Sequence, residues 1–412
     1  MKTTKIQVFE HQRLRVGEYH FEQQHLDALL KLNEFHNWSY FKPIAKGIQF
    51  TQFVGVIQIN GLLIEIHPKA DKSDSDLKWQ KVLLHMLQAC GKLKASSFTG
   101  AANVKRSSLN LLEVYFELFL TEIQRLQKNG LVKQYRKQTK NTKALKGKLE
   151  FAGHLQKNLV HKEHFYTTHQ VYDTNHLLHK VLAKAIDIIG QFTKGTYLYD
   201  FYKRVNLNFP EVDKKAITIQ QLQSIKLSRK TKDYEYALEL ARLIILNYSP
   251  DISGGREKML SLLFDMNVLW ETFVLKQLQK ECRGTTIEVY GQESKLFWGS
   301  NSLRPDIVLR TEGKTFIIDT KWKRPSNLKA SVEDLRQMYA YNRFWDAGKA
   351  LLLYPGDYKN NAFFDYQTEE YLKDGNTMKH QCKMGFVSVV NEVGELSNAV
   401  GSQLLKIIGI KT

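Results

Sequence analysis

The feature that most constrains the fold is a pair of apolar runs, late in the sequence, separated by a very short polar turn. The runs are Ile307–Leu309 and Phe316–Ile318, and β-branched or aromatic side chains dominate both. Such runs on either side of Glu312-Gly313 predict a β-hairpin. With the turn placed there, Asp306 lies directly across from Asp319 in the paired strands.

The predicted hairpin places two carboxylates and one ammonium on the same face. Side chains alternate along a strand, so Lys321 projects from the same face as Asp319. Hard divalent cations bind carboxylate oxygens, water and phosphate, and a metal held in this way activates a bound water. We therefore predict a Mg²⁺ site, in which Mn²⁺ can substitute, with Asp306, Asp319 and the backbone carbonyl of Thr320 as ligands. Lys321 would orient or help to deprotonate the attacking water, or stabilise the transition state.

Two flanking helices are predicted to complete this site. Residues 259–282 are predicted to be helical, and Glu271 has three apolar residues among its four neighbours at helical spacing. Glu271 is therefore a further candidate metal ligand or catalytic carboxylate, whereas an exposed helix glutamate is the plainer interpretation. Gln337 and Tyr341 are four residues apart, share one face of the next helix, and could contact phosphate or orient the site.

The charge of the chain favours a polyanionic partner. There are 60 Lys and Arg against 42 Asp and Glu, which gives a formal net charge of +18. Nine basic residues and no acidic ones lie between Arg125 and Lys148. Such a segment can bind double-stranded DNA through its phosphates, whereas the alternative is a solvated basic loop. The candidate DNA-binding residues are Lys133, Tyr135, Arg136, Lys137, Lys140, Lys143, Lys146 and Lys148, with Arg304, Lys323 and Arg324 beside the hairpin.

The rest of the sequence predicts a mixed α+β chain of several domains. Residues 1–75 are predicted to form a β-rich domain, because Asn60-Gly61 between alternating apolar residues is typical of a hairpin. Residues 76–250 are predicted to be a helical region with the basic segment, and 251–412 a separate α/β domain. Three cysteines without a Cys-x-x-Cys motif favour a reducing cytoplasm, and no apolar run is long enough for a membrane span.

These motifs resemble those of a known nuclease superfamily, and the whole chain resembles one family of nuclease subunits. Pro305-Asp306 followed by Asp319-Thr320-Lys321 is similar to the PD-(D/E)xK nuclease motif, with Asp in place of the commoner Glu. The whole chain resembles the McrC family, the nuclease subunits of McrBC-type modification-dependent restriction systems. Further pieces carry this resemblance: Val54–Ile57, Ile64–Lys69, Gly130-Leu131 with Tyr135, Leu145–Lys148, Asp173–Asn175, Met266-Asn267 with Trp270-Glu271, and Gln337 with Tyr341.

The resemblance implies a restriction-endonuclease-like C-terminal domain and a function in antiviral defence. It implies a partner, an McrB-like AAA+ GTPase ring, on which the N-terminal β-rich domain docks and whose GTP hydrolysis the chain stimulates. It also implies cleavage of cytosine-modified foreign DNA. This chain has no Gly-x4-Gly-Lys-Ser/Thr loop, so we expect it to bind no nucleotide itself.

Several alternatives remain open at this stage. The chain could be a catalytically idle adaptor that binds DNA and activates a GTPase, or a RecB-like repair nuclease that needs no partner. Pairing of two nuclease domains to cut both strands is also open. The filled catalytic positions Asp306, Asp319 and Lys321 favour an active nuclease over the idle adaptor.

Overall fold

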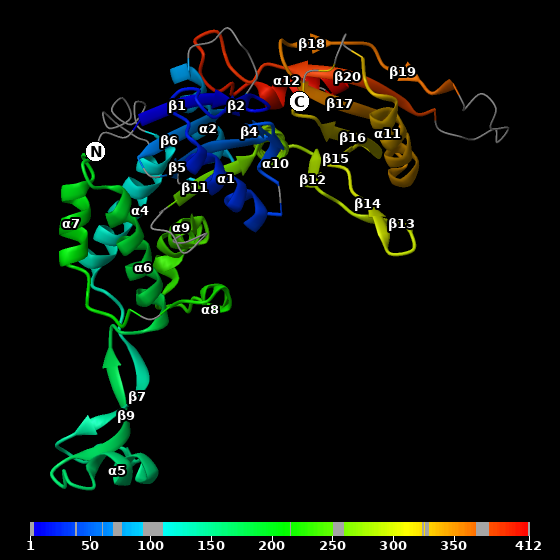
Figure 1. Cartoon of the computed structure of the whole chain (residues 1–412). Helices are drawn as coiled ribbons and strands as arrows, with labels where there is room; N and C mark the ends of the chain where they lie inside the picture. The colour runs from blue at the N-terminus through cyan, green and yellow to red at the C-terminus, as the bar shows by residue number, and fades with distance from the viewer. Residues whose placement is uncertain are drawn as a thin grey trace. The chain divides into compact units, whose positions relative to one another are not determined.

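The computed structural model describes residues 4–37, 39–59, 61–68, 76–93, 110–214, 216–249, 259–323, 325, 329–367 and 379–410. The chain is a mixed α+β protein, as predicted, and divides into two compact units (Figure 1). One unit contains 110–262 with residues 1–4 and 57–62, and the other contains 5–56, 63–109 and 263–412. The proposed division at residues 75 and 250 stays a prediction, and residues 250–258 lie outside the described part.

The unit around residues 110–262 is a group of helices with a β-arm. The helices are α4 (Leu111–Asn129), α6 (Leu177–Phe192), α7 (Tyr199–Leu207), α8 (Ile219–Ser224), the short 3-10 helix Lys232–Tyr234 and α9 (Glu235–Leu246). The arm consists of β7 (Gln134–Thr142), β8 (Lys148–Leu149), α5 (Phe151–Asn158) and β9 (Phe165–Asp173). Figure 1 shows β7 and β9 side by side, running from the helices of this unit to α5.

The N-terminal segment contains strands and two helices. The strands are β1 (Thr4–Phe9), β2 (Arg13–Arg15), β3 (Phe41–Ile44), β4 (Gly47–Phe50), β5 (Phe53–Ile59) and β6 (Leu62–His67), and the helices are α1 (Gln23–Phe35) and α2 (Asp76–Ala89). Strands β5 and β6 are sheet neighbours, in agreement with the predicted hairpin, although Asn60 lies outside the described residues. Their sheet has the order β1-β6-β5-β11-β10, with β10 (Tyr248–Ser249) and β11 (Met259–Asp265), and a second sheet has the order β2-β4-β3.

The C-terminal part is built on a mixed sheet of order β12-β15-β16-β17-β20-β18, with β19 also paired to β20. Its strands are β12 (Glu288–Gly291), β15 (Ile307–Thr311), β16 (Lys314–Thr320), β17 (Lys349–Pro355), β18 (Lys359–Asn360), β19 (Phe364–Asp365) and β20 (Gln381–Val387). The hairpin β13 (Lys295–Trp298) and β14 (Asn301–Leu303) precedes β15, and the helices are α10 (Met266–Glu281), α11 (Val332–Trp345) and α12 (Val400–Ile408).

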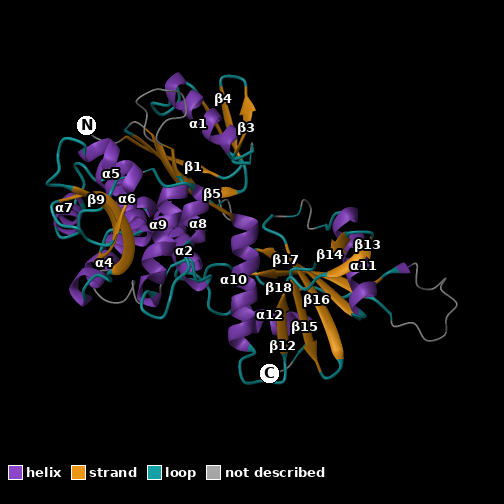
Figure 2. Cartoon of the chain, turned by 90° about the horizontal axis from the view of Figure 1, so that it is seen from below, coloured by secondary structure: helices purple, strands orange, loops and turns teal. Residues whose placement is uncertain are grey.

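Helices cover both faces of this C-terminal sheet (Figure 2). Leu352 of β17 lies in a buried cluster with Met338 and Tyr341 of α11. The neighbouring residue Leu351 points to the opposite face, where a Cβ on Gly385 would also meet Ile407 of α12. The central strands β16 and β17 are therefore buried on both sides, as their continuous apolar sequences require.

Two local predictions were incomplete. Residues 1–70 contain the helix α1 as well as strands, because Leu26, Leu29 and Leu32 form a buried stripe at helical spacing. The predicted helix 259–282 begins only at Met266, since residues 259–265 form the strand β11. A short apolar run suits either element, and here pairing within a sheet decides. Within the part of the chain that the structure describes, no helix is both long and apolar enough for a membrane crossing.

Candidate active site

The predicted hairpin and its register are confirmed. Strands β15 and β16 pair antiparallel with Ile307 opposite Ile318, which is the predicted register, and Asp306 and Asp319 are the residues that directly adjoin this pair. The turn residues Glu312 and Gly313 both have positive φ, of 47° and 72°. A two-residue turn of this kind matches the right-handed twist of the strands, so it fixes which residues face each other.

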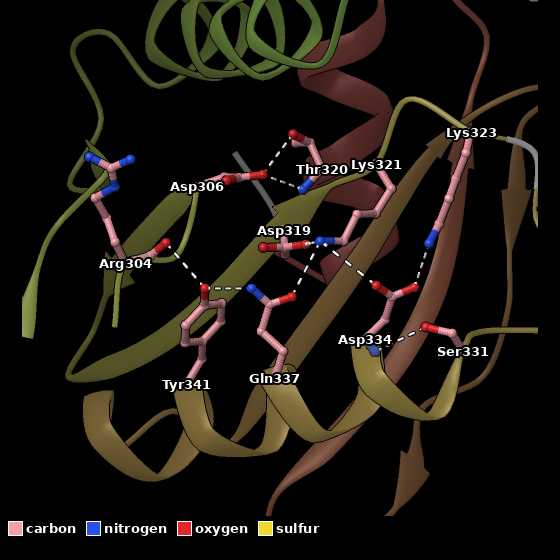
Figure 3. Close-up of polar contacts among 10 residues, drawn as sticks. All are labelled: Arg304, Asp306, Asp319, Thr320, Lys321, Lys323, Ser331, Asp334, Gln337 and Tyr341. Atoms are coloured by element: carbon pink, nitrogen blue, oxygen red, sulfur yellow. Dashed lines mark hydrogen bonds and ion pairs between the residues drawn. The ribbon is translucent and has the colours of Figure 1, made fainter. Parts of the chain in front are cut away.

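The two aspartates of the motif lie close together but have different partners (Figure 3). Oδ2 of Asp306 accepts hydrogen bonds from the backbone N–H and the hydroxyl of Thr320, at 2.6 and 2.8 Å. Oδ2 of Asp319 forms an ion pair with Nζ of Lys321, at 2.7 Å. Asp319 is only 2% exposed, so its charge is compensated by side chains of the site rather than by bulk water.

The predicted pair on α11 links the two ends of the motif (Figure 3). Lys321 donates to Oε1 of Gln337 at 3.3 Å, and Gln337 donates through Nε2 to the hydroxyl of Tyr341 at 2.8 Å. Tyr341 in turn donates to the backbone carbonyl of Arg304 at 3.2 Å. Gln337 and Tyr341 therefore connect the side chain of Lys321 to the backbone of Arg304, two residues before Asp306. Such contacts suit the site-orienting role that the sequence suggested for them.

A fourth carboxylate, Asp334, was missed from the sequence. It lies in the first turn of α11, where its backbone N–H donates to the hydroxyl of the N-cap Ser331, and it is 8% exposed. Its carboxylate lies 2.8 Å from Nζ of Lys323 and 3.8 Å from Nζ of Lys321. Asp334 lies three residues before Gln337 and so shares its helix face, a spacing that could have identified it.

Glu271 reaches the site from α10. Its Oε1 accepts a hydrogen bond of 2.6 Å from the side chain of Gln292, whose own backbone N–H donates to the carbonyl of Asp306 at 2.9 Å. Gln292 thus connects the helix to the hairpin, and nothing in the sequence marked it. Glu271 is partly buried, in agreement with the apolar neighbours noted in the sequence.

The acids of the site are held in an environment that opposes their ionisation. Burial raises the pKa of Glu271 to about 6, and the nearby charge of Asp306 adds to the effect. Burial and then the charge of Asp306 raise the pKa of Asp319 to about 6, and burial raises that of Asp306. Burial alone would lower the pKa of Lys321, but the charges of Asp319 and Asp334 outweigh it and the pKa is raised. Burial is therefore the main reason that these carboxyl groups are harder to ionise than free ones.

This donor set fits a hard divalent cation. Glu271 supplies carboxylate oxygens from α10, and Asp306 and Asp319 supply them from the hairpin; burial opposes their ionisation, which a hard cation bound to these oxygens would favour. Among the residues the structure describes, no three His, Cys, Asp or Glu side chains already form a ligand cluster. In the structure, the ammonium of Lys321 partly compensates the charge of Asp319.

The basic segment runs from the end of α4 into the β-arm. Its lysines are exposed on β7, β8 and the turn between them, whereas Arg136 is held by both carboxylate oxygens of Asp173, at 2.8–3.2 Å. Tyr135 is 72% exposed and lies against Tyr172. The arm is therefore a basic surface, and its DNA binding stays a prediction. Of the candidates beside the hairpin, Arg304 and Lys323 are exposed, and Arg324 lies outside the described residues.

A family model with the description "McrBC 5-methylcytosine restriction system component" matches residues 48–355 of this chain. The chain belongs to this family. The matched range contains Glu271, Asp306, Asp319, Lys321 and Tyr341, and so nearly the whole site described above. A curated relative is the "Type IV methyl-directed restriction enzyme EcoKMcrBC" of Escherichia coli K12, 19% identical over 253 residues, which covers 56% of this chain and 72% of the relative.

Solved structures show the same fold. A chain in the assembly of Thermococcus gammatolerans McrB AAA+ hexamers with bound McrC matches with a TM-score of 0.71 at 17% identity, and the match covers 98% of this chain and 99% of that one. A chain of the Thermococcus gammatolerans McrBC complex matches with a TM-score of 0.50 at 19% identity, covering 66% and 86%. The resemblance to the McrC family inferred from the sequence is therefore confirmed.

Proposed function

We propose that this chain is the Mg²⁺-dependent DNA endonuclease subunit of an McrBC-like restriction system, with a C-terminal domain of the PD-(D/E)xK type. The observation that carries the proposal is the convergence of Asp306, Asp319 and Lys321 on one hairpin, with Glu271 beside them. Acidic oxygens for a metal, next to a lysine, are the groups that hydrolysis of a phosphodiester bond requires.

The chemistry divides among the residues as follows. Glu271, Asp306, Asp319 and the backbone carbonyl of Thr320 would hold Mg²⁺ or Mn²⁺, which when bound offsets phosphate charge and lowers the pKa of a bound water. Lys321, raised in pKa and therefore protonated, is suited to hold the attacking water and to stabilise negative charge on phosphorus. Gln337 and Tyr341 keep Lys321 and the Asp306 segment in place, because they bond to both.

The proposed partner is an AAA+ GTPase ring, which the chain would activate and which would license cleavage. Support comes from the family membership and from the matched fold, which was solved in an assembly of McrB hexamers with bound McrC. The proposed substrate is double-stranded DNA with modified cytosine, since the family description names 5-methylcytosine restriction. We place the activity in the cytoplasm, where GTP and incoming DNA would meet the system, and paired nuclease domains would cut both strands.

The discriminating experiment combines the chain with plasmid DNA, Mg²⁺ and GTP, with and without the partner, on methylated and unmethylated DNA. The proposal expects cleavage that requires Mg²⁺, GTP and partner. Cleavage without any GTPase would favour a RecB-like repair nuclease. Stimulated GTP hydrolysis without cleavage would favour the idle adaptor.

Metal binding is expected to weaken as the pH falls through about 6. Protons and Mg²⁺ compete for the same carboxylates, and the pKa values of Glu271 and Asp319 are about 6. The rise in melting temperature caused by Mg²⁺ should therefore be large at about pH 8 and small at about pH 5. An equal rise at both values would contradict carboxylate ligation. Since this measurement needs no DNA, it separates metal binding from cleavage.

Charge reversal on the arm is expected to weaken DNA binding. Replacing Lys137, Lys140, Lys143 and Lys146 by Glu removes up to four phosphate contacts, so the slope of log affinity against log salt should flatten by about three to four units. The control is replacement of Lys194, Lys203, Lys226 and Lys230, exposed lysines elsewhere in the same unit, by Glu. An unchanged slope in the arm variant would show that the arm lysines serve something other than DNA.

A further inference from the structure

A buried hydrogen bond joins the first strand of the chain to the catalytic strand. Trp322 directly follows Lys321, and its indole N–H donates to Oε1 of Glu10 at 2.8 Å. Glu10, just after β1, is 3% exposed, and Trp322 is 8% exposed. Glutamate is almost never buried to this extent without a partner. The indole of Trp322 is therefore fixed by a residue 312 positions away.

The same indole packs against the helix that carries Glu271. The rings of Trp322 and Trp270 lie 5.5 Å apart, and Trp270 directly precedes Glu271 on α10. Trp270 is fully buried. A displacement of the Trp322 ring would thus move the backbone next to Lys321. A displacement of the Trp270 ring would move the backbone next to Glu271. Close packing transmits such a displacement, because a protein interior leaves little free space.

Glu10 itself is held by the N-terminal strands. Its backbone N–H donates to the carbonyl of His67, the last residue of β6, at 2.9 Å. The N-terminal segment also holds the start of α10, where the backbone N–H of Met266 donates to the carbonyl of Gln52 at 3.1 Å. The side chain of Gln52 donates to Asp265, the residue that caps this helix, at 3.3 Å. All of these residues belong to one compact unit.

We propose that Glu10 is a positioning residue of the active site, which acts through Trp322 and Trp270 to hold Glu271 at the position that metal binding requires. The proposal rests on the proposed nuclease function and deepens it. It assigns to the N-terminal segment a part in the catalytic geometry, because the residue directly after β1 fixes Trp322. Residues that orient metal ligands from behind typically change metal affinity or activity by 10- to 100-fold when they are replaced.

The test uses the full chain and its partner, with Glu10→Leu and Trp322→Phe as the disrupting variants. Trp322→Phe keeps an aromatic ring and removes the donor, and Glu10→Gln keeps an oxygen that can accept the same hydrogen bond. We expect the Mg²⁺ concentration for half-maximal cleavage to rise roughly tenfold in the two disrupting variants. It should stay near the wild-type value in Glu10→Gln. The double variant should resemble the single variants, since both remove one interaction.

If Glu10 and Trp322 only stabilised the fold, their replacement would lower the melting temperature without changing the Mg²⁺ midpoint. Thr51→Val is the control for such a purely structural effect. Thr51 is 7% exposed in the same unit, and its hydroxyl lies within hydrogen-bond distance of the carbonyls of Ser39 and Tyr40, at 2.9 and 2.8 Å. Among the residues that the structure describes, no hydrogen bond joins this hydroxyl to Trp322 or Trp270. This variant should lower the melting temperature without moving the Mg²⁺ midpoint. Equal midpoints in wild type, Trp322→Phe and Thr51→Val would overturn the positioning role.

A second readout separates this proposal from the proposed function. The Mg²⁺ concentration that half-saturates the rise in melting temperature needs neither DNA nor partner. If wild-type protein binds Mg²⁺ but does not cleave, the nuclease proposal fails, while a raised midpoint in Trp322→Phe would still support the role of Glu10. If wild-type protein shows no response to Mg²⁺, both proposals fail.

Discussion

The Asp319→Asn variant is expected to lose DNA cleavage and at the same time to become more stable. Asp319 lies at the centre of the site, opposite Asp306 and paired with Lys321. Loss of a metal-binding carboxylate removes several kcal/mol of charge stabilisation in the transition state. This corresponds to a fall in the cleavage rate of roughly 10³-fold or more. The rate should be measured with partner, GTP and Mg²⁺ at saturating DNA.

The gain in stability follows from the raised pKa of Asp319. Its pKa is about 6 in the folded protein, against about 3.9 in an unfolded chain, so in metal-free protein ionisation of the folded state is unfavourable. The stabilisation that the bound proton gives is complete below about pH 4 and is lost as the pH rises through about 6. A neutral asparagine avoids this loss, and we expect a gain of about 1–3 kcal/mol at pH 8.

Chemical denaturation without divalent metal measures whether Asp319→Asn raises or lowers the free energy of unfolding. The difference between Asp319→Asn and wild type should be largest near pH 8 and should shrink toward zero near about pH 4. Asp357→Asn, a change of an exposed acid in the same C-terminal part, should alter neither cleavage nor stability. Wild-type rates in Asp319→Asn would refute the assigned role, and a loss of stability at pH 8 would refute the electrostatic account.

The sequence predicts the central part of the site because that part is local. The turn at Glu312-Gly313 and the alternation of side chains determine that Asp306 faces Asp319, and both act within a few residues. Helical spacing likewise placed Gln337 and Tyr341 on one face. No tertiary information is needed for contacts of this range.

The parts that escaped prediction depend on contacts between distant segments. Gln292 joins Glu271 to the hairpin, and the bond between Trp322 and Glu10 spans 312 positions. A single sequence carries no sign of such pairings. The strand at residues 259–265 was mistaken for helix for the same reason, since only its neighbours in the sheet distinguish the two. The local sequence therefore identifies the chemical groups of the site, whereas packing between distant segments determines where some of them lie.

The Lys321→Met variant is expected to bind metal as well as wild type, or better, and yet to cleave poorly. The ammonium of Lys321 lies 2.7 Å from Oδ2 of Asp319, a candidate metal ligand. Removing it eliminates a competitor for that oxygen, so the Mg²⁺ midpoint of thermal stabilisation should stay equal or fall. The cleavage rate should drop by roughly 10²- to 10⁴-fold, because the group that holds the attacking water or stabilises charge on phosphorus is gone.

Lys323→Met is the matched control for Lys321→Met. Lys323 also contacts Asp334, at 2.8 Å, but its side chain is 50% exposed and no contact joins it to Asp319 in the part of the chain that the structure describes. This variant should weaken DNA binding and leave the rate at saturating DNA nearly unchanged, since exposed ion pairs contribute at most about 1 kcal/mol. If Lys321→Met instead lost Mg²⁺ binding together with cleavage, the lysine would serve to build the metal site rather than to act on the substrate. If Lys321→Met lost its cleavage rate but kept Mg²⁺ binding, Lys321 would act in the chemical step and the acids around it would bind the metal.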